Sequence, residues 1–248
     1  MSWSWGQKYF AEFLGTFGLL LSVGGAAVFS GVADDSGAAR VILIAAALAF
    51  GVLGMIYAFG DVSGAHFNPA VTIGFWVSGR FPGRQVVPYI IAQLLGGVVA
   101  TGIVAAVAWG GPSGTFSFVQ MIALASQGYS GNGAPYAWSL TAVFLLEVTF
   151  TFFLVLVILF ATRSENSSKN LAPIGIALTL LMTNLVAIPV DGASVNPARS
   201  FAPAILSAAW SSGQWAIKED WLFWVAPIIG GIVAALVDRA MRARPGTA

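Results

Sequence analysis

The fold follows from Gly64-Ala65-His66-Phe67-Asn68-Pro69-Ala70 and its second copy, Gly192-Ala193-Ser194-Val195-Asn196-Pro197-Ala198. Each stretch places Asn-Pro-Ala after a loop that contains glycine. Asn is a strong N-cap and Pro loses no hydrogen bond at the first helical position, so each motif predicts a helix that begins at Asn-Pro. The apolar run that follows has roughly 10 residues, against the ~20 that span a bilayer. Each copy therefore predicts a half-helix with its positive N-terminal end facing its own loop.

The composition places these half-helices in a membrane. Of 248 residues, 58% are hydrophobic and only 8% are charged, whereas soluble domains carry about a quarter charged residues. A net charge of +1 argues against a nucleic-acid partner. With no Cys and one His, the chain has no pattern typical of a metal site, a catalytic site or a cofactor site. We therefore expect an all-α membrane protein that is not an enzyme.

Six apolar segments are long enough to span the bilayer. They cover residues 8–31, 39–60, 86–109, 138–161, 171–190 and 221–241. The two half-helices, at 68–78 and 196–207, follow the second and fifth spans. The sequence thus predicts six transmembrane helices plus two re-entrant half-helices.

The two halves of the chain repeat. Residues 11–17 resemble 146–152, and residues 92–97 resemble 226–231, in the same order as the two Asn-Pro-Ala motifs. Each half holds three spans, an odd number, so the second copy is expected to be inverted in the membrane. We expect one channel domain over 1–248, with inverted repeats at about 8–110 and 137–243. The two half-helices would then meet near the midplane.

Basic residues predict the orientation. With the N-terminus inside, two lie outside, Arg40 and Lys218. Eight lie inside, namely Lys8, Arg80, Arg84, Arg163, Lys169, Arg239, Arg242 and Arg244. We therefore expect both termini in the cytoplasm, and the short tails are typical of a prokaryotic inner membrane protein.

These motifs carry a family resemblance. Residues 63–72 and 194–200 make the chain similar, over essentially its whole length, to the aquaporin (major intrinsic protein) family, and to its bacterial-type water channels. The resemblance implies one pore per protomer, a homotetramer in the lipid bilayer, and water and small uncharged solutes as the molecules that pass.

The loops before the asparagines are expected to line a cavity, because irregular backbone is not tolerated against lipid. Asn68 and Asn196 would present amide donors at the centre and interrupt a proton wire, and the two positive helix ends would repel cations. The alternative is that each Asn only caps its helix. In the first reading, the loop carbonyls would accept hydrogen bonds from the permeating molecule. These are the carbonyls of Gly64, Ala65, His66, Gly192, Ala193 and Ser194.

Arg199 follows the second motif, where the first has Val71. A charge at membrane depth is costly and usually functional, and the resemblance implies that this Arg forms the outer selectivity filter. The alternative is a structural Arg paired with a carboxylate, for which Asp191 is the nearest candidate.

The resemblance, counted without gaps, puts Leu48, Asn184 and Ala193 in the same filter. Strict water channels of the family usually have Phe and His where this chain has Leu48 and Asn184. Phe50 is the alternative to Leu48, but removing two residues from a helix would turn everything beyond it by ~200°. The ring is expected to be less tightly built, which argues against strict selectivity for water. Ser200, Ala204 and the pair Phe223-Trp224 match the water-channel side of the family, so we expect water first, with ammonia, hydrogen peroxide, urea or glycerol as additional solutes.

Glu12 and Glu147 occupy equivalent places in the first and fourth spans. We expect them to accept hydrogen bonds from the two loops and so to support them. A proton relay is the alternative reading of intramembrane carboxylates, and it would suit a proton-coupled secondary transporter. His66 is expected to make a fixed side-chain bond, although it could titrate. A passive water channel is therefore the first reading, and an aquaglyceroporin-like channel is the second.

Overall fold

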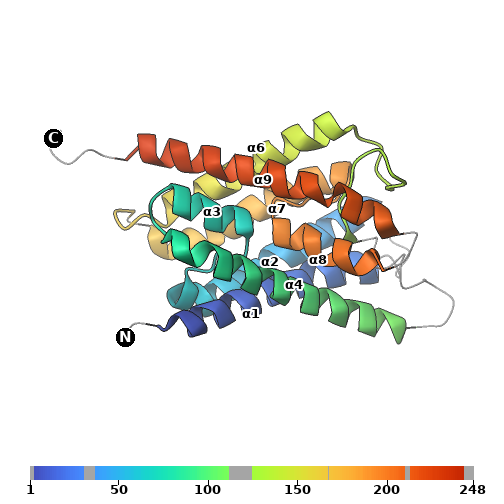
Figure 1. Ribbon diagram of the computed structural model, residues 1–248, viewed down its shortest axis with the longest axis horizontal. Coiled ribbons are helices and arrows are strands. Elements are labelled where there is room, and N and C mark those ends of the chain that lie inside the picture. The colour runs from blue at the N-terminus through green and yellow to red at the C-terminus, as the bar shows by residue number, and fades with distance from the viewer. Residues whose placement is uncertain (1–2, 31–36, 112–124, 167, 210–212, 243–248) are drawn as a thin grey trace.

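A computed structural model describes residues 3–30, 37–111, 125–166, 168–209 and 213–242, and within them the chain is all-α (Figure 1). Two short helices, α3 (Pro69–Val77) and α8 (Pro197–Ser207), follow the two loops. Six helices are long and apolar enough to cross a membrane, α1 (Trp5–Ser30), α2 (Gly37–Ser63), α4 (Val86–Trp109, preceded by the 3-10 turn Gly83–Gln85), α6 (Leu140–Ala161), α7 (Ala172–Asp191, preceded by the 3-10 turn Lys169–Leu171) and α9 (Gln214–Ala240). The expected fold class is confirmed.

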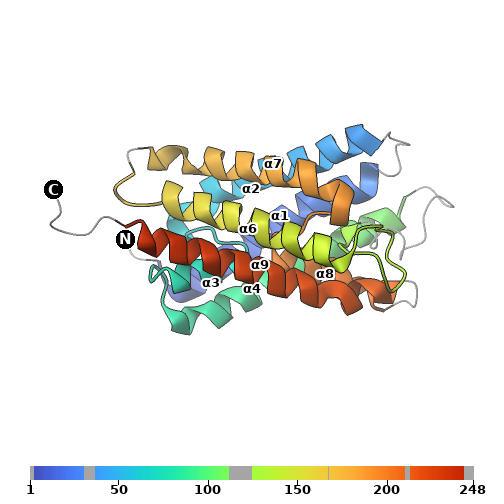
Figure 2. The ribbon, with the colours of Figure 1, turned by 90° about the horizontal axis from the view of Figure 1, so that it is seen from above.

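The long helices lie side by side along the longest axis (Figures 1 and 2). Helix α1 packs on α4 and on α2, α6 packs on α9, and α2 packs on α7. Each half-helix packs on a spanning helix of the other half, α3 on α9 and α8 on α4. The start of α1 and the end of α9 lie at the same end of the bundle, which we call the terminal end, opposite the far end.

Helix α9 differs from the prediction because it begins at Gln214, about two turns before residue 221. The sequence suggested that Glu219 and Asp220 would lie outside the span. Both are buried instead, with their carboxylates bonded to protein donors, one to the backbone N–H of Tyr129 and the other to the indole of Trp224. A buried charge is tolerated when it is hydrogen-bonded.

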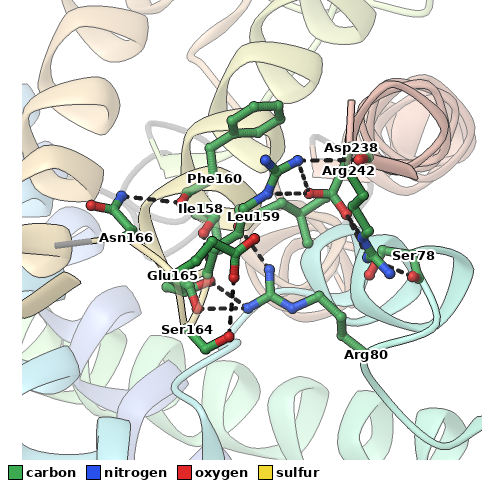
Figure 3. Close-up of polar contacts among 12 residues, drawn as sticks. Ser78, Arg80, Ile158, Leu159, Phe160, Ser164, Glu165, Asn166, Asp238 and Arg242 are labelled. Carbon is green, nitrogen blue, oxygen red and sulfur yellow. Dashed lines mark hydrogen bonds and ion pairs between the residues drawn. The ribbon is translucent and has the colours of Figure 1, made fainter. Parts of the chain in front are cut away.

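At the terminal end, Asp238 joins three elements (Figure 3). Its buried carboxylate accepts from Arg163 at 2.9 Å and from Arg242 at 2.6 Å. Arg242 also donates to the carbonyl of Ser78, just past the end of α3, at 2.7 Å. Because a helix leaves its last carbonyls unpaired, this contact completes the C-terminal end of α3 and ties it to α9.

Arg80 does the same for α6. It donates to the carbonyl oxygens of Leu159 at 2.7 Å and Thr162 at 2.8 Å (Figure 3). A cation at a helix C-terminus is also favoured by the helix dipole. Arg244, which we counted with the inside basic residues, lies outside the described residues.

Candidate functional site

The two half-helices meet at their N-termini, and each begins at its asparagine. The side-chain Oδ1 of Asn68 accepts from the backbone N–H of Ala70 at 2.8 Å, and that of Asn196 accepts from Ala198 at 3.0 Å. These are N-cap bonds, and Pro occupies the first helical position in both. Local sequence chemistry therefore sets where each half-helix starts.

Each asparagine also donates across the junction. Asn68 Nδ2 donates to the carbonyl of Val195 at 2.7 Å, and Asn196 Nδ2 donates to the carbonyl of Phe67 at 3.0 Å. An amide nitrogen carries two hydrogens, so one N–H of each asparagine remains for another acceptor. Both asparagines line the central cavity. The asparagines thus cap their helices and face the cavity at the same time.

The two loops share an unusual backbone, with positive φ at three matching places. The values are +90° at Gly64, +50° at Ala65, +48° at Phe67, +88° at Gly192, +55° at Ala193 and +48° at Val195. For non-glycine residues this conformation costs roughly 1–2 kcal/mol each. Such a loop persists only where its surroundings hold it.

Glu12 holds the first loop. Its side chain is fully buried, and Oε1 accepts from the backbone N–H of His66 at 2.9 Å and from the Ser63 hydroxyl at 2.7 Å. Oε2 accepts from the backbone N–H of Phe67 and from Gln93 Nε2, both at 2.7 Å. All four are hydrogen bonds to a carboxylate, and such charge-assisted bonds are stronger than those between neutral groups.

Glu147 holds the second loop in the same way. Its two oxygens accept from the backbone N–H groups of Ser194 and Val195, each at 2.8 Å. Asp191 adds a third bond, from the backbone N–H of Ala193 at 2.8 Å. Glu12 and Glu147, at equivalent positions in the two halves, therefore have the same role: each accepts hydrogen bonds from the backbone of one loop.

A cavity of about 730 Å³ runs from Trp5 and Lys8, at the terminal end, past both asparagines to Arg199. Eight of the residues predicted for the site line it: Leu48, Gly64, Ala65, His66, Asn68, Ser194, Asn196 and Arg199. Asn184, Gly192 and Ala193 do not, and neither do the Pro and Ala residues of the two motifs. The described residues hold no cluster of His, Cys, Asp or Glu that could bind a metal.

Leu48 and Phe50 have opposite surroundings. Leu48 is 3% exposed and lines the cavity, whereas Phe50 is 71% exposed on the outside of the bundle. Residues two apart on a helix point about 200° apart. The structure thus places Leu48, and not Phe50, on the side of α2 that faces the cavity.

Asn184 is fully buried one turn beyond the described cavity wall. On α7 the wall includes Ala172, Ile176 and Leu180, and this spacing of four continues to Asn184. Its Nδ2 donates to the carbonyl of Leu180 at 2.9 Å, while its Oδ1 has no partner among the described residues. Asn184 thus continues the spacing of this α7 stripe beyond the cavity wall, with an acceptor that is unpaired among the described residues.

Arg199 is held by two carbonyl groups and not by a carboxylate. Its Nη1 donates to Ala125 at 2.7 Å, and its Nη2 donates to Gly192 at 3.1 Å. No ion pair joins Arg199 to Asp191 in the described part of the chain, and Asp191 Oδ1 accepts from the backbone N–H of Ala193. The alternative reading of Arg199, a structural pair with Asp191, is therefore wrong.

His66 is fixed at the other end of the first loop. Its Nδ1 lies 3.2 Å from the hydroxyl of Thr72, and its ring stacks on Phe75 with centroids 4.5 Å apart. Phe81 and Tyr89 also contact the ring. The side chain has the fixed bond that the sequence suggested.

Our reading of the sequence missed the apolar wall of the cavity. Leu154 and Ile158 of α6 and Ile176 and Leu180 of α7 line it. In each helix these pairs are four residues apart, which is the spacing of one helix face. In a chain this apolar, four-residue spacing of apolar side chains does not distinguish a helix face that lines a cavity from one that contacts lipid.

Comparison with known proteins gives the family. The family model for the major intrinsic protein matches residues 1–238. Aquaporin Z of Rhodopseudomonas palustris is 41% identical over 241 residues, with 96% of this chain and 95% of the relative covered. Aquaporin Z of Photorhabdus laumondii is 41% identical over 238 residues, with 95% and 97% covered.

The fold agrees. The X-ray structure of the aquaglyceroporin from Plasmodium falciparum superposes with a TM-score of 0.79 at 24% identity, covering 96% of this chain and 97% of that one. The family consists of membrane channels rather than enzymes. This chain therefore belongs to the major intrinsic protein family.

Proposed function

We propose that the chain is a passive channel for water, with one single-file pore through each protomer. The observation that carries the proposal is the pair of asparagines, capped, bonded across the junction and lining one cavity. Donors fixed at the centre orient a passing water molecule, and two helix N-termini repel cations. Relatives named Aquaporin Z at 41% identity support the same solute.

The proposed outer filter consists of Leu48, Asn184, Ala193 and Arg199. Arg199 at the end of the cavity and Leu48 on its wall support it, and Asn184 lies one turn further along the α7 stripe. The acceptors offered to water would be carbonyls of the loop residues Gly64, Ala65, His66, Gly192 and Ser194. We further propose a homotetramer in a bacterial inner membrane, with both termini cytoplasmic and the two halves related by inversion.

A broader solute range is the second candidate. Leu48 and Asn184 are less bulky than the Phe and His of strict water channels, so glycerol, urea or ammonia would meet a wider ring. The aquaglyceroporin neighbour supports only the fold here, because its identity is 24%.

A proton-coupled transporter receives less support. Such a protein needs a carboxylate that can release and rebind a proton. Both oxygens of Glu12 and of Glu147 already accept hydrogen bonds from the loops that they support. These bonds favour a fixed structural role over the binding and release of a proton.

Stopped-flow shrinkage of proteoliposomes tests the proposal. A passive channel gives fast shrinkage with a low activation energy, and an ionophore that collapses the proton gradient leaves it unchanged. Water permeability equal to that of protein-free vesicles would refute the proposal. Solute uptake that stops with the ionophore would support the transporter.

A further inference from the structure

The loop between α4 and α6 is fastened to the second half of the pore in its described part. We call residues 125–132 the filter loop; it lies at the far end of the bundle, where α9 begins (Figure 2). The carbonyl of Ala125 accepts from Arg199 at 2.7 Å, and the backbone N–H of Gly128 donates to the carbonyl of Asp191 at 3.1 Å. The filter loop thus supplies one of the two acceptors that hold Arg199.

Glu219 anchors the other end of the filter loop. It is fully buried near the start of α9, and its Oε2 accepts from the backbone N–H of Tyr129 at 2.9 Å. Its Oε1 accepts from Asn132 Nδ2 at 3.3 Å. Glu219 does not line the central cavity, so it acts on a permeating solute only through other residues.

Gly128 shows how closely the filter loop fits its seat. A Cβ atom at this position would lie 2.7 Å from the Trp215 ring, 2.8 Å from Glu219 Oε2 and 3.0 Å from the Tyr136 ring. Real Cβ atoms essentially never approach within 3.0 Å of another group. Trp215 and Glu219 of α9 therefore fix how closely the filter loop packs against that helix.

We propose that Glu219 is a positioning residue for solute selectivity. It holds Tyr129, four residues from Ala125, and so fixes the carbonyl that aims the Arg199 guanidinium at the outer filter. Arg199 Nε has no partner among the described residues, so without Ala125 the side chain keeps only the carbonyl of Gly192. The inference rests on the proposed channel function and adds a determinant outside the pore.

The chemistry favours a large effect from a small movement. Hydrogen bonds from backbone N–H groups to a buried carboxylate are charge-assisted and about twice as strong as neutral ones. A displacement of about 1 Å at a site that depends on orientation can change a rate by up to ~100-fold. Selectivity is a difference between two solutes, so a looser Arg199 is expected to reduce discrimination before it reduces water flow.

The test compares Glu219→Ala with the unmodified chain in proteoliposomes, by stopped-flow measurement of water, glycerol and urea permeability. We expect the glycerol-to-water ratio to rise about tenfold, the change that loss of one charge-assisted bond gives, with water permeability retained. Glu219→Gln keeps an oxygen for Tyr129 and is expected to restore most of the discrimination. A purely structural role would lower all permeabilities together and leave the ratio unchanged.

Gly128→Ala provides a second route to the same displacement with Glu219 intact, and it decides the matter if Glu219→Ala fails to fold. The matched control is Asp220→Asn, because this neighbouring buried carboxylate accepts from Trp224 of its own helix and is expected to leave the ratio unchanged. Native ratios in folded Glu219→Ala and Gly128→Ala channels would overturn the proposal. Absence of water flow through the unmodified chain would instead refute the channel function.

Discussion

Asn68 and Asn196 bond each other's loops reciprocally, each donating to the carbonyl just before the other asparagine, at 2.7 and 3.0 Å. The same side chains cap their own half-helices. Two helix N-termini that face each other bring positive dipole ends together, which is unfavourable without acceptors between them. The carbonyls of Val195 and Phe67 supply those acceptors, so one pair of residues both closes the junction and presents donors to the cavity.

Asn196→Ala removes a cap and a bond across this junction. Loss of an Asn cap costs about 1 kcal/mol, and the second half-helix also loses its contact with Phe67. We expect a lower unfolding midpoint, reduced water permeability and weaker proton exclusion, measured by stopped flow with a pH-sensitive dye in the vesicles. Asn166→Ala is the control, because that side chain bonds the carbonyl of Phe160 and the backbone N–H of Ser168, both outside the site. Native proton exclusion in Asn196→Ala would contradict this role.

Leu48→Phe and Phe50→Leu form a matched pair that tests the filter position on α2. Leu48 is buried on the cavity wall, whereas Phe50 is 71% exposed. A ring at position 48 narrows the cavity, so glycerol and urea permeability should fall several-fold more than water permeability. Phe50→Leu should change neither. The reverse result, a solute effect from Phe50 alone, would assign the filter position to the exposed residue.

Local chemistry made the main elements predictable. The half-helices begin at Pro69 and Pro197 because Asn-Pro is itself a start signal, and spans follow from apolar length alone. The start of α9 was placed too late because Glu219 and Asp220 read as the polar end of a span. Their buried partners cannot be seen in a local window.

The surroundings of Arg199 were not predictable for the same reason. Its acceptor Ala125 is 74 residues away in sequence, and Glu219 is 90 residues from the Tyr129 amide that it binds. The nearest carboxylate in sequence, Asp191, was therefore the candidate partner in the alternative reading of Arg199. In the fold, Asp191 Oδ1 accepts from the backbone N–H of Ala193, whose φ is +55°, and Arg199 donates to carbonyl groups instead.

Asn184→His tests whether the last position of the α7 stripe belongs to the filter. Imidazole is bulkier than the amide and would add a donor close to Arg199 if both line one ring. We expect glycerol and urea permeability to fall about tenfold, in the range that a single lost pocket contact gives, with water flow retained. Leu178→His, on the exposed side of α7, is the control. Identical permeability in Asn184→His and the unmodified chain would remove Asn184 from the constriction.

Glu12→Gln tests the support of the first loop. Each oxygen of Glu12 accepts from two donors. In either orientation of the Gln side-chain amide, its NH2 group would therefore face two donors and leave them without an acceptor. Unmet buried donors cost about 1–3 kcal/mol each, and we expect a clear fall in the thermal unfolding midpoint in detergent. The exposed Glu165, which accepts from Ser164, gives the control Glu165→Gln. An unchanged midpoint in Glu12→Gln would mean that the loop does not depend on the carboxylate.

Gly96→Ala and Gly230→Ala test the close helix crossing within each half, α4 on α1 and α9 on α6. A Cβ at Gly96 would collide with the carbonyl oxygen of Phe13 on α1, and one at Gly230 with that of Val148 on α6. Both obstacles are backbone, so the helices would have to separate, at a cost of about 1–3 kcal/mol or more. Gly102→Ala on α4 meets nothing within 4 Å and should be neutral or stabilising by up to about 1 kcal/mol. Thermal unfolding of the three variants in one detergent measures the difference, and equal midpoints would show that α1 and α4, and likewise α6 and α9, are free to move apart.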